Sequence, residues 1–351
     1  MSAEAEHHLR IRNLKVGFEI FEGYVDVLDV GELTLDAGES YGLVGESGAG
    51  KTVLALAVMG LLRQPPAHVE ADECSLQGDE ILKMTPKELR EMRGRRVAMI
   101  FQDPMSSLDP VFTAGQQLAE VLRRREGLKK RQAEARAMEF LRLVELPDPE
   151  MLQGKYPHEL SGGQRQRVII ALALACGAGV LIADEPTRNL DVTVQASMLK
   201  TMDRLRREFG MSVLLIANNL GLISAMCEHV GILLHGRIAE TGPVRDVIDD
   251  PLHPYTIDLL NAVPRKEERM GDLAAEALEK LERSESSCWH YPRCKVREER
   301  CKTLDPLELA PVSGTHSVAC WRYIDAGPAD RPLVAAETRA AEAVAAAEGS
   351  G

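Results

Sequence analysis

The most chemically informative segment is a glycine-rich loop with the spacing of a phosphate-binding loop (P-loop). It consists of Gly45, Glu46, Ser47, Gly48, Ala49, Gly50, Lys51 and Thr52. Glycines let the backbone curl so that its N–H groups point at phosphate oxygens, and the N-terminus of the following helix adds a favourable field for anions. Lys51 is expected to pair with the β- and γ-phosphates, and the Thr52 hydroxyl to ligate Mg²⁺. The spacing therefore predicts a site for the phosphates of a nucleotide.

Two adjacent acids, Asp184 and Glu185, follow the apolar residues 181–183. A buried strand that ends in such a pair would place Asp184 on Mg²⁺, directly or through water. Glu185 would then polarise the attacking water. Paired acids before Pro186 could instead cap a helix, but the P-loop upstream favours a hydrolytic role for both.

A second predicted anion site lies at the start of an expected helix over residues 164–175. Its four residues are Ser161, Gly162, Gly163 and Gln164. Their N–H groups and the hydroxyl would face an anion much as the P-loop does. With Leu160 in front and the acid pair shortly after, this element makes the sequence similar to the ATP-binding cassette (ABC) ATPases. In that family it acts on ATP held by a second, facing subunit, so the resemblance implies ATP, Mg²⁺ and paired ATPase subunits.

The resemblance also implies roles for residues that would be unremarkable alone. Gln102 corresponds to the family's Q-loop, whose amide can reach Mg²⁺ or water and which relays the nucleotide state to a membrane partner. Asp191 matches the D-loop aspartate that crosses the dimer interface. Phe18 is the residue expected to stack on adenine, with Phe21 and Tyr24 as rivals and a core position as the alternative for Phe18.

The sequence departs from the family pattern after the predicted strand at residues 213–216. Leu220 and Gly221 fix the register, so Asn218 occupies the position of the family's switch histidine. Asparagine can donate a hydrogen bond, but it is shorter than histidine and cannot carry a proton. Losing one preorganised donor at a developing negative charge typically costs about 10²–10³ in rate. We therefore expect slow or no hydrolysis of ATP on this chain's own P-loop, with ATP and Mg²⁺ binding preserved.

Asn189 is a second departure, because the family has a small residue at this position. Two weakened sites would result if the chain paired with a copy of itself. A heterodimer would retain one complete site, formed by the P-loop of a second ATPase and the intact signature of this chain. The sequence therefore favours a heterodimer over a homodimer.

Four cysteines cluster near the C-terminus with gaps of five, six and 18 residues: Cys288, Cys294, Cys301 and Cys320. Four thiolates can hold a [4Fe–4S] cluster or a tetrahedral Zn²⁺. Zinc ribbons favour cysteine pairs separated by two to four residues, and these gaps are longer. Together with the resemblance to the subfamily described next, the spacing favours an iron–sulfur cluster over zinc or free thiols.

The segments at residues 102–110, 253–256 and 262–264 resemble the oligopeptide and dipeptide importer ATPases, and so does the cysteine set. The resemblance covers residues 9 to about 325. It implies an ATPase subunit on the cytoplasmic side of the inner membrane, beside a second ATPase and beneath two permease subunits. An extracytoplasmic binding protein would select the substrate, and peptides, nickel chelates, opines or sugars all fit.

Two other functions remain open from the sequence. The chain could be an ATP-binding regulatory subunit whose own site does not turn over. It could also be a soluble ABC ATPase of a metabolic complex, such as the phosphonate-cleavage machinery.

The net charge and the distribution of apolar residues argue against several other classes of function. A net charge of −12, from 42 basic and 54 acidic residues, argues against non-specific nucleic-acid binding. The N-terminus has neither a basic segment nor an apolar core of an export signal. The longest apolar stretch, residues 168–183, is too short and too interrupted to span a membrane. We therefore expect a cytosolic protein that does not bind nucleic acid.

These residues require a scaffold in which strands alternate with helices. β-like runs are expected at residues 9–16, 27–35, 180–183 and 213–216, and helices at 51–62 and 133–144. This alternation predicts an α/β fold with a mostly parallel sheet covered on both faces, as in P-loop NTPases. The family resemblance adds an antiparallel β subdomain and an inserted helical subdomain at about residues 110–165.

The expected domain organisation follows changes in composition along the chain. It comprises an ABC ATPase domain at 9–264, a linker at 265–287, a four-cysteine module at 288–325 and a disordered tail at 327–351.

Overall fold

The structure, a computed structural model, describes residues 7–261, 288–302 and 309–324. Its larger sheet has eight strands in the order β12-β13-β11-β10-β3-β9-β8-β7. These strands are β3 (Ser40–Val44), β7 (Val97–Ile100), β8 (Val180–Asp184), β9 (Ser212–Ala217), β10 (His229–Leu234), β11 (Arg237–Pro243), β12 (Ala310–Ser313) and β13 (His316–Val318). The run from β10 to β7 is parallel, whereas β11, β13 and β12 add antiparallel. The predicted parallel core is present, within a sheet that is mixed.

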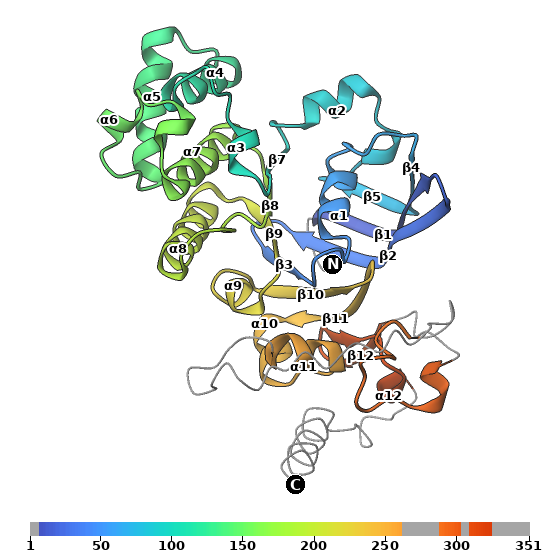
Figure 1. The fold of residues 1–351 in the computed structure, drawn as a ribbon. Helices are drawn as coiled ribbons and strands as arrows, with labels where there is room; N and C mark the ends of the chain where they lie inside the picture. Colours follow the sequence, from blue (N-terminus) through green and yellow to red (C-terminus); the bar gives the residue numbers. More distant parts are fainter. Residues whose placement is uncertain (1–6, 262–287, 303–308, 325–351) are drawn as a thin grey trace, which may run out of the picture.

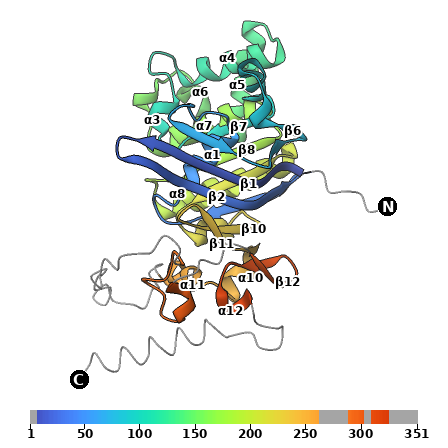
Figure 2. The same cartoon turned by 90° about the vertical axis from the view of Figure 1, so that its right-hand side faces the viewer.

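A second, antiparallel sheet lies beside the first, and its two long strands at residues 7–36 are drawn in dark blue in Figure 2. Its strands are β1 (His7–Ile20), β2 (Gly23–Asp36), β4 (Ala67–Glu70), β5 (Glu73–Leu76) and β6 (Asp79–Glu80). Strand β1 pairs antiparallel with β2, β4 and β5. The two β-like runs at the start of the sequence therefore form one long hairpin, several residues longer than their apolar cores.

The central strands are buried on both faces, which explains why they are continuously apolar in sequence. In β8, Leu181 and Ala183 belong to one hydrophobic cluster, while Val180 and Ile182 belong to another on the opposite face. Alternate side chains of a strand point to opposite faces, so both faces must be covered. Helices α1 (Lys51–Val58) and α2 (Pro86–Met92) contribute to the second cluster, and α8 (Val192–Phe209) and α9 (Leu220–Ser224) to the first.

Helix α1 is shorter than the predicted helix over residues 51–62. It ends at Val58, and Gly60 has a φ of +60°. A glycine in the left-handed region is a common way to terminate a helix. The Ala and Leu spacing that suggested four further residues continues past this break.

Five helices gather at one end of the molecule, at the upper left of Figure 1. They are α3 (Pro104–Ser107), α4 (Ala114–Glu126), α5 (Lys130–Leu143), α6 (Pro149–Leu152) and α7 (Gly162–Ala175). Thr113 caps α4 and exchanges hydrogen bonds with Gln116, which fixes where this helix begins. Helix α5 includes nearly all of the predicted helix at 133–144. The inserted subdomain at about 110–165 falls on these helices and stays a prediction.

The C-terminal elements lie below β11 in both Figure 1 and Figure 2. They are α10 (Val244–Asp249), α11 (Pro254–Asn261), the 3-10 turn Glu299–Lys302 and α12 (Trp321–Ile324). Strand β13 pairs with β11, so residues from the cysteine-rich segment extend the main sheet. The predicted linker and tail lie outside the described residues, and the domain boundaries stay predictions. Among the described helices, none is long and apolar enough to cross a bilayer.

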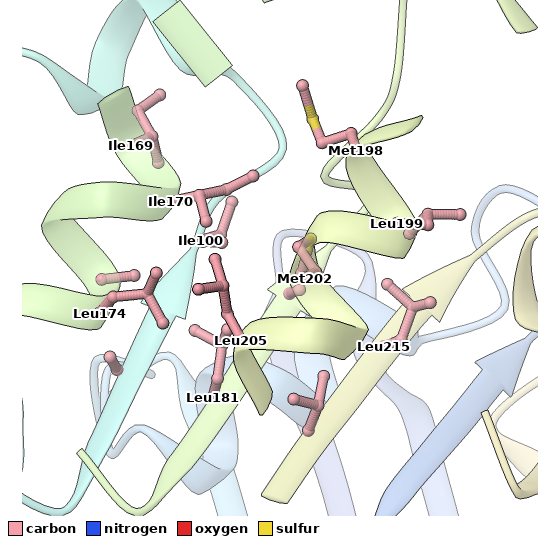
Figure 3. Close-up of a cluster of buried hydrophobic side chains, with 14 of the residues drawn as sticks. Ile100, Ile169, Ile170, Leu174, Leu181, Met198, Leu199, Met202, Leu205 and Leu215 are labelled. Atoms are coloured by element: carbon pink, nitrogen blue, oxygen red, sulfur yellow. The ribbon is translucent and has the colours of Figure 1, made fainter. Parts of the chain in front are cut away.

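We expect the fold to be most sensitive to shortening of side chains in the hydrophobic cluster between α7, α8 and the sheet. Figure 3 shows side chains from these elements meeting around Leu205, which is fully buried. We expect Leu205→Ala to lower the free energy of unfolding by about 2–5 kcal/mol, because it leaves a cavity in a close-packed core. Lys200→Ala, on an exposed position of the same helix, should change it by less than about 0.5 kcal/mol. Urea unfolding monitored by circular dichroism measures both, and equal effects would contradict this account.

Candidate functional site

The P-loop connects the buried strand β3 to the start of α1. Gly48 and Gly50 have φ values of +85° and +101°, a region that only glycine adopts without strain. A Cβ on Gly45 would lie 2.3 Å from the carbonyl oxygen of Leu233, so this position must also lack a side chain. The glycines that the sequence placed here are therefore required by backbone conformation and by packing.

Lys51 lies at the first position of α1 and is almost completely buried. Its Nζ donates hydrogen bonds to the carbonyl oxygens of Gly45, at 2.7 Å, and Glu46, at 2.8 Å. Burial lowers the pKa of Lys51, while the nearby carboxylates of Glu185 and Asp184 act to raise it. The ammonium group is thus held directly against the loop whose N–H groups are expected to bind phosphate.

Thr52 and Asp184, separated by 132 positions in sequence, meet at the carboxyl end of β8. The Thr52 hydroxyl donates a hydrogen bond of 2.7 Å to Asp184 Oδ2. Within the described structure, Asp184 Oδ1 is buried and accepts no hydrogen bond. Burial raises the pKa of Asp184, and the hydrogen bond from Thr52 partly offsets this.

These two oxygen-bearing side chains fit Mg²⁺. Mg²⁺ in phosphate-transfer sites takes one or two protein ligands and completes its shell with phosphate oxygens and water. A buried carboxylate oxygen without a hydrogen bond, next to a hydroxyl group, is a donor set of this kind. Asp184 and Thr52 are therefore the residues that would hold the ion.

Glu185 receives hydrogen bonds from three side chains. Gln102 Nε2 and Arg188 Nη1 donate to its Oε2 at 3.0 Å and 3.2 Å, and Asn218 Nδ2 donates to its Oε1 at 2.5 Å. Its backbone has a φ of +46°, and its N–H donates to the carbonyl oxygen of Ile216 on β9. The structure thus brings the three predicted catalytic residues, Gln102, Glu185 and Asn218, into one cluster. A carboxylate held from both oxygens has a defined orientation next to Lys51.

Arg188 was not among the residues selected from the sequence. Its guanidinium forms an ion pair with Glu185 at 3.2 Å, three positions along the chain. The sequence does show an arginine three positions after Glu185. This spacing alone does not show that the turn between them brings the Arg188 and Glu185 side chains together.

The Ser-Gly-Gly signature lies at the N-terminus of α7, which begins at Gly162, two residues before the predicted start. Ser161 caps the helix, since its Oγ accepts from Gln164 N–H at 3.3 Å and Gln164 Oε1 accepts from Ser161 N–H at 2.8 Å. The apolar residues of α7 pack on the face of the sheet opposite α1. The signature and the P-loop thus precede helices that pack on opposite faces of the sheet within one chain.

Asp191 and Asn189 lie in the exposed turn between β8 and α8. Asp191 caps α8 by accepting a 3.0 Å hydrogen bond from Val194 N–H, and Asn189 has a φ of +62°. Asparagine is one of the few residues other than glycine that tolerate this conformation. The turn is at the surface, and the role of Asp191 at a subunit interface stays a prediction.

The three candidates for stacking on adenine all lie on the β1–β2 hairpin. Phe18 is partly buried against the hydrophobic cluster that includes α1. Tyr24 is half exposed and lies 5.7 Å from the ring of His68, and Phe21 is fully exposed at the end of the hairpin. The choice of Phe18 stays a prediction, and its partial burial also fits the alternative of a core position.

The four clustered cysteines line one small cavity, but they do not form a metal centre. All four line this cavity, and burial raises the pKa of Cys294 to about 11 and that of Cys320 to about 12. Over residues 7–261, 288–302 and 309–324, no three His, Cys, Asp or Glu side chains are placed to hold a metal ion. The prediction of a [4Fe–4S] cluster at Cys288, Cys294, Cys301 and Cys320 is therefore wrong, and the same finding gives Zn²⁺ no support.

Comparison with known families gives two matches in consecutive parts of the chain. Residues 28–188 match the ABC transporter family, and residues 239–301 match the C-terminal region of oligopeptide/dipeptide transporters.

Individual relatives are similar over most of the chain. A probable peptide ABC transporter ATP-binding protein of Sinorhizobium fredii is 38% identical over 91% of this chain and 96% of its own. The oligopeptide transport ATP-binding protein OppD of Salmonella typhimurium is 41% identical over 90% of this chain and 94% of its own. Among solved structures, a dimeric ATP-binding cassette bound to ADP and Pi aligns with a TM-score of 0.59 and 25% identity, covering 68% of this chain and 99% of its own.

The geometry around Asp184 predicts a magnesium-dependent effect on nucleotide affinity. We expect Asp184→Asn to weaken ATP binding by at least about 10- to 100-fold when Mg²⁺ is present, because the variant removes a charged ligand of the ion. In EDTA the variant and the native chain should bind ATP alike. Titration with a fluorescent ATP analogue under both conditions tests this, and an equal loss with and without Mg²⁺ would argue against the assignment.

Proposed function

Because this chain belongs to the ABC transporter family, in the oligopeptide/dipeptide branch, we propose that it is the ATPase subunit of a peptide-type ABC importer. The family resemblance and the ATPase class are confirmed by these similarities. The observation that carries the proposal is the similarity to peptide-import ATP-binding proteins over 90% or more of the chain. Such a role requires two permease subunits, an extracytoplasmic binding protein and a position on the cytoplasmic side of the inner membrane.

Different residues of this chain would have different roles in phosphoryl transfer. The P-loop N–H groups and Lys51 would bind and orient the ATP phosphates. Thr52 and Asp184 would hold Mg²⁺, which supplies charge neutralisation at the β- and γ-phosphate oxygens. Glu185, oriented by its hydrogen-bond donors, would position the attacking water and accept its proton. Closure by the signature of a second ATPase would exclude bulk water from this site.

A surface next to Gln102 supports docking of a permease. A cleft of about 1720 Å³ opens there and is lined in part by Phe101 and Phe112. These residues and Met105 and Val111 nearby are large apolar side chains with exposed fractions of 40–68%. Clustered exposed apolar side chains are typical of a protein interaction surface. Because Gln102 donates to Glu185, a permease segment in this cleft would be linked to the hydrolytic carboxylate by one side chain.

The hydrogen bond between Asn218 and Glu185 supports a weakened hydrolysis site on this chain. Histidine at this position could carry a proton and reach further toward a γ-phosphate, whereas the shorter Asn218 amide is engaged by Glu185 Oε1. The signature at Ser161 retains its helix N-terminus and precedes a helix that packs on the opposite face of the sheet from α1. We therefore infer an asymmetric pair, in which this signature completes the active site on the P-loop of a second ATPase.

The same observation supports one variant of the proposal, a subunit that binds ATP at its own site without turnover. In both cases the partner's site would drive transport. The match at residues 239–301 to the transporter C-terminal region favours these roles over a soluble metabolic ABC ATPase.

Docking at the cleft can be tested by co-purification. We expect Phe112→Asp to reduce recovery of the chain with its two permeases from membranes at least about tenfold, because it places a charge in an apolar contact. Phe209→Asp, at a similarly exposed phenylalanine on α8, should leave recovery unchanged. If the native chain binds no permease, the transport proposal is wrong; if both variants behave alike, this surface is not the docking site.

The asymmetry can be tested by ATP turnover of the assembled complex. Ser161→Arg should lower turnover about 10²-fold or more, because it blocks the anion site offered to the partner's ATP. Lys51→Ala should lower turnover much less, because the site it removes is already slow. Asn218→His should raise turnover by adding the missing donor. If Ser161→Arg leaves turnover intact, or Lys51→Ala has the larger effect, the asymmetric assignment is overturned.

A further inference from the structure

The C-terminal part of the chain contacts the P-loop directly at Glu46. The Tyr255 hydroxyl on α11 accepts a 2.9 Å hydrogen bond from the Glu46 N–H. Arg293, from the cysteine-rich segment, donates from Nη1 to Glu46 Oε1 at 2.9 Å. Two elements that lie more than 200 positions after the P-loop therefore hold its second residue, one by its backbone and one by its side chain.

A third contact connects residues 288–302 to the turn that is hydrogen-bonded to the P-loop. The ring of Trp289 stacks on His235 with 4.9 Å between centroids and 18° between planes. His235 is in the tight turn between β10 and β11, where the next residue, Gly236, donates its N–H to the carbonyl oxygen of Ala49 at 2.9 Å. Residues 288–302 thus pack both on the P-loop and on the turn that supports it.

The carboxylate of Glu46 is unfavourable for phosphate binding by the P-loop, and the ion pair with Arg293 offsets its charge. A carboxylate in an anion-binding loop repels the triphosphate of ATP, and at about 6 Å a unit charge in a mostly aqueous environment changes affinity roughly three- to tenfold. The two side chains are 49% and 44% exposed, so their pairing contributes little to folding stability. The benefit of the pair is therefore expected at the nucleotide site, where Arg293 cancels the charge of Glu46.

We propose that residues 288–302 are a positioning element for the nucleotide site of their own chain, in which Arg293 neutralises Glu46 while Tyr255 fixes its backbone. This inference rests on the proposed function in one respect, that the P-loop binds ATP. Displacement of the segment would expose the Glu46 carboxylate to the phosphates and weaken ATP binding. The C-terminal segment, which follows all the nucleotide-binding motifs, thereby gains control over nucleotide affinity in the same subunit.

Titration of the full-length chain with Mg·ATP tests the charge effect. Arg293→Gln should weaken binding about three- to tenfold at about 0.02 M salt and much less at about 0.5 M salt, because screening acts on exposed charges. The double variant Glu46→Gln with Arg293→Gln removes both charges together and should bind Mg·ATP about as tightly as the native chain. Arg297→Gln serves as the matched control, since Arg297 is in the same segment but contacts Tyr291 and Pro292. A purely structural role of Arg293 would instead leave the double variant as weak as Arg293→Gln alone, with a loss that does not depend on salt.

The backbone contact is tested by deleting single buried hydroxyl groups. Tyr255→Phe should weaken ATP binding about two- to tenfold, because the Glu46 N–H loses its acceptor. Tyr41→Phe removes a buried hydroxyl that bonds Thr241, away from the loop, and should leave ATP affinity unchanged at a similar loss of thermal stability. Native-like binding by both Arg293→Gln and Tyr255→Phe would overturn the positioning role alone. If the native chain binds no ATP, or binds it equally well with Lys51→Ala, the proposed function fails together with this inference.

Discussion

The hydrogen bond from Thr52 to Asp184 joins the P-loop to the end of β8, and the arrangement of the whole site depends on it. Asp184 ends β8 and Thr52 follows the loop after β3, and the carboxyl ends of these parallel strands lie at the same edge of the sheet. At this edge a P-loop hydroxyl and a carboxylate 132 positions later come within hydrogen-bond distance, so the two could share one ion. The apolar strands, covered on both faces, keep the two groups at a fixed separation. The buried carboxylate of Asp184 is stabilised by the Thr52 hydroxyl and by the charges of Lys51 and Arg188.

Glu185, next to this pair, accepts a hydrogen bond from Asn218, the residue at which the sequence departs from the family pattern. Its carboxylate is held by Gln102, Arg188 and Asn218 together. Gln102 comes from the surface proposed to meet a permease, and Asn218 from the position of a switch histidine. The Glu185 carboxylate is therefore bonded both to Gln102, which is proposed to relay contact with a permease, and to Asn218, which is proposed to weaken hydrolysis. The proposed consequence is a site that binds ATP and Mg²⁺ but whose hydrolytic step lacks a donor that can carry a proton.

Local patterns in the sequence predicted much of this structure. The glycine spacing located the P-loop, and the continuous apolar runs located β8 and β9. Where a local pattern was extended too far, it failed, as in the helix that ends at Val58 because Gly60 adopts a left-handed conformation. The cysteine spacing also failed, since it suggested thiolate ligands for a metal. In the described part of the chain the four cysteines line one small cavity, but no three metal-ligating side chains are placed there to hold an ion.

By itself, the sequence determined the family, the nucleotide-binding motifs and the departure at Asn218, because each is encoded in the order of a few adjacent residues. Only the tertiary structure decided which distant groups meet. Asn218 and Glu185 are 33 positions apart, and Arg293 and Glu46 are 247 positions apart, yet each pair is within hydrogen-bond distance. No local spacing encodes such pairs, because they follow from how strands order in the sheet and how the C-terminal segment packs beneath it. The link between that segment and the nucleotide site is therefore a property of the fold.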